Sequence, residues 1–420
     1  MRAALFVFVA LGLWSVANAA DQSHAEFRAE ALSSAARGDL PAARHAIDAA
    51  IRLRPDSPRY LRDLAAIAAR ADDSTAAIAA LRQIAAFGVY LNVERDADLA
   101  TLQGSAAFRE VLQRLADNRE PQGTAEVFAE LPGRTGIIEG IAHRDQAQEL
   151  FFGDVHHRCV WRRGRDGRTV RFTAADEDLL GIFGLAIDEP RRALWAAMTA
   201  GPEMAGFTKE QKGHAALAEF DLLTGELRRV IEVPQEGRDH GLGDLLVAPD
   251  GTVYATDGFA PVVWMLAPGA EDLQKVADTP VFGSLQGLAL QGGTLLVADY
   301  TNGLFAIELS TGNVAALPAP QGTTLLGLDG MVRVPGGIVA VQNGVIPQRV
   351  LRIGLAPDWT AVTTVNVLAA AQPNLDDLAL VTLVHGQPVI VAGSGWELFA
   401  PAKAPQPPAH TVRIFQIAVP

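Results

Sequence analysis

Residues 286–299 read QGLALQGGTLLVAD, two short apolar runs separated by a glycine pair. An apolar run, a turn and a second apolar run are typical of a β-hairpin. The same order recurs along the chain, and each copy begins with one variable residue followed by a glycine. Its other copies are EGIAHRDQAQELFFGD (139–154), FGLAIDEPRRALWAAM (183–198), LGDLLVAPDGTVYATD (242–257) and DGMVRVPGGIVAVQN (329–343). In the third copy the glycine is Gly243 and the residue before it is Leu242.

Most copies of the repeat follow one another at a similar spacing. Its heads are separated by 44, 59, 44 and 43 residues, and a looser sixth copy begins at Leu375. Units of this length with four short strands each indicate a β-propeller. Six copies predict a six-bladed ring over residues 124–419, closed by pairing of the terminal runs TAEVFAEL and TVRIFQIAV in one blade. An elongated sandwich is the alternative, but it does not account for the fixed repeat.

The segment before the repeat has a different composition. Residues 26–118 are rich in Ala, Leu and Arg with helical spacing, and Gly38 indicates a turn between two helices. A shift of 34 residues superposes Arg28 on Arg62, which is the period of tetratricopeptide repeats. We therefore predict a multidomain α + β protein, with a small tetratricopeptide-like helical array over residues 24–118 before the propeller. The array either binds a peptide or protein partner or packs on its neighbour.

Charge and the N-terminus bear on location and partners. The formal net charge of −13 argues against nucleic-acid binding, because phosphate contacts need a basic surface. Residues 1–19 carry Arg2, an apolar run and Ala17-Asn18-Ala19, the order of a secretory signal peptide. A membrane anchor is the alternative, but the apolar run is short for a span. Since Cys159 is the only cysteine, no intramolecular disulfide can form, and we expect a bacterial periplasmic or secreted protein without a membrane span after cleavage.

The residues at the heads of the repeats share one register. In a propeller the first strand of each blade lines the central channel, so these residues surround one axis. They are Glu139, Phe183, Leu242, Gln286 and Asp329. Two carboxylates and an amide then converge on one end of the channel, where buried acids without a cation repel each other and where Ca²⁺ or Mg²⁺ finds the oxygen ligands it prefers. Asp and Gln also form turns with backbone amides, so register alone leaves a metal site and plain turn residues as alternatives.

The heads EGIA, QGLAL and DGM, with the strands LVAD and AVQNG, carry a family resemblance. Over residues 124–419 the chain resembles the regucalcin/gluconolactonase/luciferin-regenerating-enzyme family of six-bladed propellers. The resemblance implies a divalent metal in the channel, held by Glu139, Gln286 and Asp329. Gln286 stands where the family has Asn, and its longer side chain favours Ca²⁺, whose ligand shell is flexible.

The activity that the resemblance implies is that of a metal-dependent lactonase or ester hydrolase. The ion polarises the carbonyl, a base deprotonates water, and the ring opens to a hydroxy acid. Asp329 is the implied ligand and proton acceptor, and His240 is the alternative base, although a histidine before a strand is often a hydrogen-bonded loop residue.

Substrate contacts are expected in the same region. In the third blade, Gly243-Asp244 stands where the family has a substrate-holding Asn-Asp pair, so Gly243 removes one contact. Asp244 and Asn343 are the expected contacts to a small lactone or ester. The alternative function is a non-catalytic periplasmic propeller that binds a ligand or protein, with the helical repeats docking a partner.

Overall fold

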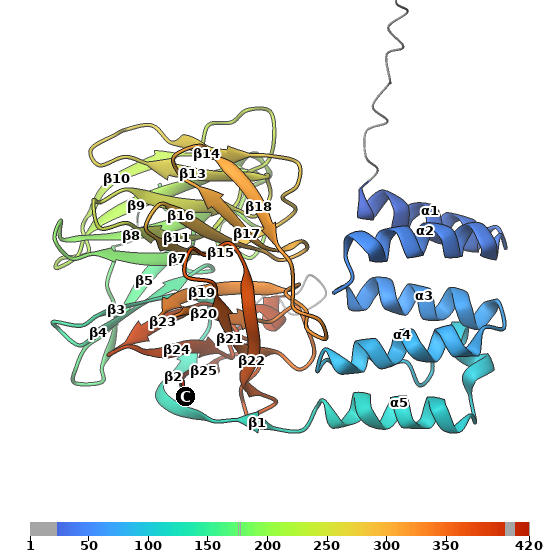
Figure 1. Cartoon of the computed structure of the whole chain (residues 1–420). Helices are drawn as coiled ribbons and strands as arrows, with labels where there is room; N and C mark the ends of the chain where they lie inside the picture. The colour runs from blue at the N-terminus through green and yellow to red at the C-terminus, as the bar shows by residue number, and fades with distance from the viewer. Residues whose placement is uncertain (1–22, 175, 177, 400–407, 420) are drawn as a thin grey trace, which may run out of the picture.

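A helical array and a β-propeller lie side by side in the computed structural model (Figure 1). The structure describes residues 23–174, 176, 178–399 and 408–419. The predicted signal peptide falls outside these residues and stays a prediction. Across the described ranges, no helix combines the length and the apolar character that a membrane span requires.

Each helix of the array begins directly after a residue whose side chain caps the helix N-terminus. Its elements are α1 (His24–Ala36), α2 (Leu40–Leu53), α3 (Pro58–Arg70), α4 (Ser74–Ala86), the 3₁₀ helix η1 (Ala97–Leu102) and α5 (Ala106–Asp117). The capping side chains belong to Ser23, Asp39, Ser57, Asp73, Asp96 and Ser105. Helix α3 begins 34 residues after α1, and α4 begins 34 residues after α2, as the repeat predicts. Membership of the tetratricopeptide class stays a prediction.

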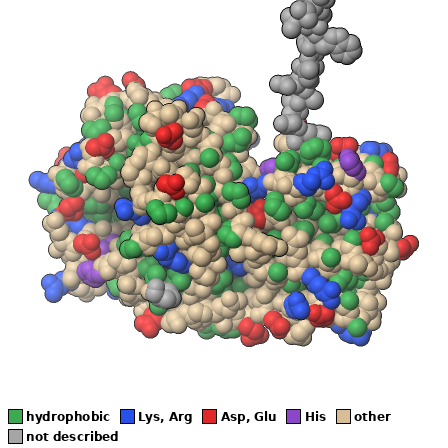
Figure 2. Space-filling model, viewed as in Figure 1, with side chains coloured by type: hydrophobic (Ala, Val, Ile, Leu, Met, Phe, Trp, Pro, Cys, Tyr) green, Lys and Arg blue, Asp and Glu red, His purple; other side chains and the backbone are tan. Residues whose placement is uncertain are grey.

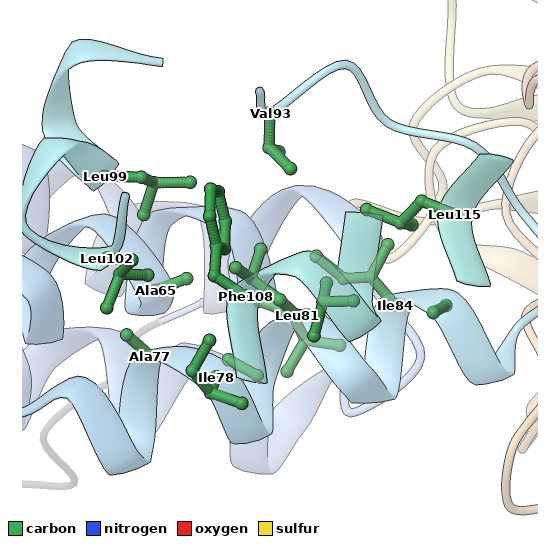
Figure 3. Close-up of a cluster of buried hydrophobic side chains, with 14 of the residues drawn as sticks. Ala65, Ala77, Ile78, Leu81, Ile84, Val93, Leu99, Leu102, Phe108 and Leu115 are labelled. Carbon is green, nitrogen blue, oxygen red and sulfur yellow. The ribbon is translucent and has the colours of Figure 1, made fainter. Parts of the chain in front are cut away.

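A buried hydrophobic core joins α4 to α5 in the second half of the array. Figure 3 shows Leu81 and Ile84 of α4 packed near Phe108 and Leu115 of α5. All four side chains are at most 1% exposed. Burial of one Leu or Phe side chain contributes roughly 1.5–3 kcal/mol, so this cluster fixes α5 on α4.

The propeller follows in six antiparallel sheets. Its strands are β1 (Gln122–Gly123), β2 (Ala125–Arg134), β3 (Ile138–Arg144), β4 (Glu149–Asp154), β5 (Cys159–Arg163), β6 (Thr169–Arg171), β7 (Gly181–Asp188), β8 (Ala193–Thr199), β9 (Ala215–Asp221), β10 (Leu227–Glu232), β11 (Leu242–Val247), β12 (Val253–Asp257), β13 (Val262–Leu266), β14 (Gln274–Asp278), β15 (Leu285–Gln291), β16 (Thr294–Asp299), β17 (Gly303–Glu308), β18 (Asn313–Leu317), β19 (Leu328–Val334), β20 (Gly337–Gln342), β21 (Arg349–Leu355), β22 (Val362–Ala370), β23 (Val381–Val384), β24 (Gln387–Ala392) and β25 (His410–Ile417). Two short 3₁₀ helices are η2 (Lys209–Gln211) and η3 (Trp396–Phe399).

The strand order confirms the predicted propeller. The first five blades run β3 to β6, β7 to β10, β11 to β14, β15 to β18 and β19 to β22, each from the innermost strand outward. The sixth runs β23-β24-β25-β2, so the first long strand of the propeller closes the ring against the last, as expected from the terminal runs. Strand β1 pairs with β22 and ties the segment after α5 to the fifth blade.

Charged side chains of both signs are interspersed over the face of the molecule in Figure 2. They lie on the array as well as on the propeller, and neither sign gathers into one broad patch on this face.

Candidate functional site

The innermost strands of the first five blades share one irregularity. In each, the pairing with the second strand shifts by one residue, which marks a β-bulge. The shifts lie between Ile138/Ile141, Ile182/Leu185, Leu242/Asp244, Leu285/Leu288 and Leu328/Met331. A bulge re-aims side chains, and here it does so at the same height in five blades.

This shared bulge corrects one predicted register. Leu242 aligns with Leu285 and Leu328, which are fully buried in the blades. The third-blade residue at the level of Gln286 and Asp329 is therefore Gly243 and not Leu242. The prediction from the residue before the glycine was wrong in this blade, because the third blade has its only head glycine one position earlier than the others.

In four of the five bulges the second residue is a glycine, which lets neighbouring blades approach closely. A Cβ atom on Gly140 would lie 2.0 Å from the carbonyl oxygen of Phe183, and one on Gly287 would lie 2.4 Å from that of Asp329. Real side chains cannot occupy such positions, so these glycines set the spacing of the inner strands. The residues before them consequently converge near the axis.

These residues line a pocket of about 260 Å³ at one end of the channel. The structure brings all three predicted metal ligands together there, with Asn343 from the end of β20. The lining residues are Glu139, Phe183, Thr199, Gly241, Leu242, Gly243, Gly258, Phe259, Ser284, Gln286, Asp329, Asn343 and Trp396. Their supports are strands of five blades and the loops that follow β12, β20 and β24.

Glu139 and Asp329 are both 8% exposed. Burial, and then repulsion by Asp329, raises the pKa of Glu139 well above its usual range, against a hydrogen bond from Trp396 Nε1 to Glu139 Oε2. Burial raises the pKa of Asp329 to about 6, against hydrogen bonds from Asn343 and the Gly330 backbone. Both carboxylates are therefore unfavourable as bare anions, and a cation between them would remove that cost.

Asn343 carries an oxygen without a partner. Its Nδ2 donates to Asp329 Oδ2 at 2.5 Å and to the carbonyl oxygen of Leu378 at 2.9 Å. Two acceptors on one side fix the orientation of the amide, since a flipped amide would place oxygen against oxygen. Its Oδ1 is buried and accepts no hydrogen bond from the described residues. Buried polar atoms nearly always have a partner, so a ligand of this oxygen is expected.

Gln286 has room for its extra methylene group. Its Nε2 donates to Ser284 Oγ at 3.2 Å, so the other amide atom, Oε1, points away from Ser284. Oε1 lies 3.4 Å from the place where a Cβ on Gly243 would stand. A Cβ at 243 would be in ordinary van der Waals contact with this oxygen, so Gly243 leaves open space beside the longer Gln286 side chain.

No group of three His, Cys, Asp or Glu side chains in the described part of the chain is arranged to hold a metal. Two carboxylates and two amide oxygens are the donors at this pocket, and such oxygen sets suit Ca²⁺ or Mg²⁺ better than Zn²⁺. The residues therefore fit a hard divalent cation. The metal assignment itself stays a prediction.

Asp244 is not among the residues that line this pocket. It lines a wider cavity of about 560 Å³ that continues along the channel between the innermost strands of all six blades. Its Oδ1 accepts a hydrogen bond from the Leu245 amide at 2.8 Å. Burial raises the pKa of Asp244 to about 8, and the charge of Asp329 adds to the shift. Its predicted substrate contact is not tested by this placement.

The raised pKa of Asp244 predicts a pH effect on stability. A carboxyl group that is harder to ionise in the folded state contributes stability below the unfolded pKa, near 4, and this stability is lost as pH rises through about 8. With a chelator present, Asp244→Asn should therefore raise the melting temperature relative to wild type, and the gap should widen from pH 4 to pH 8. The exposed Asp272→Asn is the control. Parallel curves for wild type and Asp244→Asn would refute the effect.

His240 is fully buried and does not line the pocket. Its Nδ1 lies 2.6 Å from Asp257 Oδ2, and the Trp264 indole donates to the same carboxylate oxygen. The first blade repeats this arrangement, where His157 and a tryptophan seven residues after the acid contact Asp154. A repeated Asp-His-Trp set favours a structural role at the blade edge. The role of His240 as a base stays a prediction without support from its position.

Sequence reasoning missed Trp396. This residue begins η3 in the sixth blade and reaches Glu139 in the first, 257 positions away in the chain. Its ring also lies 6.0 Å from that of Phe183, at an interplanar angle of 38°. The sixth repeat unit ends in GSGW, and no motif in it signals a contact with the first blade.

Comparisons with known proteins show no family for this chain. No family model matches the chain, and no curated protein matches it. A gluconolactonase from Xanthomonas campestris is 17% identical, over 68% of this chain and 88% of that one, with a TM-score of 0.47. The PQQ-bound aldose sugar dehydrogenase of Streptomyces coelicolor is 13% identical, over 71% and 100%, with a TM-score of 0.48.

A virginiamycin B lyase from Staphylococcus aureus is similar to about the same extent. It is 13% identical, over 64% of this chain and 82% of that one, with a TM-score of 0.47. These three proteins differ in activity, and likeness at this level does not decide among them. The function of this chain has to be argued from its own pocket.

Proposed function

We propose that the pocket binds one divalent cation, with Ca²⁺ preferred, and that the protein hydrolyses a small lactone or ester there. The observation that carries the proposal is the unpartnered Asn343 Oδ1 beside two buried carboxylates. Glu139, Asp329 and the oxygens of Gln286 and Asn343 would hold the ion. Export to the periplasm belongs to the same proposal and rests on the sequence of residues 1–19.

Residues of the chain would orient the ligands and accept a proton in the proposed reaction. A bound cation would polarise the substrate carbonyl and stabilise the oxyanion that forms on it. Trp396 fixes Glu139 by donating to Oε2, and Asn343 fixes Asp329 by donating to Oδ2. Asp329 is the candidate acceptor for a proton of the attacking water, through a carboxylate oxygen that does not contact the cation, since an oxygen bound to a cation is a weaker base.

The lining favours an uncharged substrate. Lys, Arg and His do not occur among the described residues that line the pocket. Phe183 and Trp396 form an aromatic wall, and Phe259 is 65% exposed beside it. A charged group held against this wall, away from the proposed cation, would lose its hydration without gaining a counter-charge. Neutral aryl or alkyl esters and lactones are therefore the expected class.

Phenyl acetate and 4-carboxyphenyl acetate test this class as a matched pair. With saturating Ca²⁺, kcat/KM should be at least about tenfold lower for the charged ester, which corresponds to roughly 1.4 kcal/mol of transition-state binding. The control is the rate at which each ester hydrolyses under the same conditions without the protein. If no ester or lactone of a neutral panel turns over while Ca²⁺ is bound, the hydrolase proposal fails and cation binding stands alone.

One observation favours a second candidate, a non-catalytic binding module. The only predicted base outside the proposed ligand set, His240, is buried away from the pocket. In addition, the array has a cavity of about 410 Å³ beside α5, lined by residues that include Tyr90, Leu112 and Arg119. A partner peptide at the array stays part of this alternative, and the absence of turnover would favour it.

A further inference from the structure

One loop of the fifth blade connects the pocket with the helical array. It begins after Gln342, the last residue of β20, and ends at Arg349, the first residue of β21. At its start, Asn343 donates to Asp329 in the pocket. At its end, Arg349 donates to the array. Asn343 and Arg349 are six residues apart in the chain, so one short loop links the two contacts.

Arg349 caps a helix of the array. Its Nη1 donates to the carbonyl oxygens of Phe87 at 2.9 Å and Gly88 at 3.1 Å. Phe87 is the C-cap of α4, where helix carbonyls lack partners and the helix dipole is negative. Arg349 is only 3% exposed, and burial lowers its pKa to about 10. A buried cation therefore depends on the array for part of its solvation.

The same arginine also holds the base of the loop. Arg349 Nε donates to Gln342 Oε1 at 2.7 Å. Gln342 is fully buried, and its Nε2 donates to the carbonyl oxygens of Thr324 at 3.0 Å and Leu326 at 2.7 Å. Gln342 directly precedes Asn343 in the chain. The backbone from which Asn343 projects is thus fixed by a hydrogen-bonded series that ends on α4.

Two further contacts hold the middle of the loop against the array. The Tyr90 amide donates to the carbonyl oxygen of Ile346 at 2.5 Å. Val345 packs against the hydrophobic core that contains α4 and α5. On the opposite side, the Gly344 amide donates to the carbonyl oxygen of Gly327. The loop is therefore held between the array and the fifth blade.

We propose that the helical array is a structural part of the pocket, and that Arg349 is a positioning residue that sets the place of Asn343 through this loop. The inference rests on the proposed cation site, because Asn343 Oδ1 is one of its donors. Residues that orient a metal ligand without touching the metal matter for affinity, since a ligand held in place loses less freedom on binding. The array would then support the site instead of only carrying a separate partner.

Gly88→Ala tests the inference from the array side, without touching the pocket. Gly88 has φ +68°, and a Cβ there would lie 3.1 Å from Arg349 Nη1. Gly104 is the matched control, with φ +78° and no atom within 4 Å of its Cβ position. Both substitutions strain a left-handed backbone in the array, and only the first displaces Arg349.

We expect Gly88→Ala to weaken Ca²⁺ affinity, measured by calorimetry, about tenfold, the size usual for residues behind a metal ligand. Hydrogen exchange of the amides of residues 343–349 should become faster in Gly88→Ala, while exchange in β9 stays as in wild type. Gly104→Ala should match wild type in both measurements. The inference is overturned if the two variants bind Ca²⁺ equally well, or if exchange of the loop is the same in both.

Arg349→Lys and Arg349→Met give a second test at the other end of the contact. Lysine keeps the charge and one donor direction but not the fork that reaches Gln342 and α4 together, so partial rescue is expected relative to methionine. If Arg349→Met does not fold, the comparison of Gly88→Ala with Gly104→Ala decides whether the inference holds. If the wild type binds no cation, the proposed function fails, and loop exchange in the glycine pair alone decides whether the array holds the loop.

Discussion

Asp329→Asn and Glu139→Gln should each weaken Ca²⁺ binding by about a hundredfold or more, since each removes one of the two charges that suit a hard divalent cation. Without a cation, the same variants should melt at a higher temperature than wild type above pH 7. The folded-state pKa of both groups is raised, to about 6 for Asp329. Their stability contribution is thus present below about pH 4 and is lost as pH rises through the folded pKa.

Added Ca²⁺ should reverse this order. A ligand at a hundred times its dissociation constant stabilises the folded state by about 2.7 kcal/mol, and only the wild type should receive that gain. Melting curves recorded with chelator and with Ca²⁺ measure the order of stabilities without a cation and its reversal by the cation. Glu126→Gln, an exposed carboxyl on β2, is the control and should follow wild type throughout. Variants that are less stable than wild type in chelator would contradict the electrostatic account.

Gly140→Ala and Gly287→Ala should each lower the free energy of unfolding by about 3 kcal/mol, at the upper end of the range for overpacked interiors. The new Cβ atoms would stand 2.0 Å and 2.4 Å from carbonyl oxygens of the next blade. Backbone atoms cannot rotate away as a side chain can, so neighbouring inner strands would have to separate. Denaturant unfolding measures the loss.

Gly293→Ala is the control for these two variants. Gly293 lies in the hairpin between β15 and β16, and nothing stands within 4 Å of its Cβ position. Its unfolding free energy should change by less than about 1 kcal/mol. Equal effects in Gly287 and Gly293 would show that close approach of the inner strands does not determine the register of the pocket.

The fold could be predicted because the same sequence pattern recurs from blade to blade. A copy such as 286–299 specifies two strands and a turn, and recurrence of such units every 43 to 59 residues indicates a ring of blades. The convergence of Glu139, Gln286 and Asp329 follows from the same register and was predicted. The third blade was not predicted correctly, because Gly243 occupies the first bulge position there and its apolar neighbour Leu242 was taken for the head.

The rest of the pocket depends on contacts between distant segments. Trp396 reaches Glu139 across the closure of the ring, and Arg349 reaches Phe87 across two domains. No periodicity encodes such contacts, since each joins residues that follow unrelated local patterns. His240 shows the opposite error, because its position just before a strand agrees with a base at the rim, whereas its side chain is buried against Asp257.

The most direct measurement is a crystal structure of the protein soaked in Ca²⁺ or, for its anomalous signal, Mn²⁺. The account predicts one ion in the pocket of about 260 Å³, with oxygens of Glu139, Asp329 and Asn343 at about 2.3–2.6 Å from Ca²⁺. Gln286 Oε1 should complete the protein ligands. A pocket that holds only water at saturating Ca²⁺, with Glu139 and Asp329 sharing a proton, would contradict the central claim.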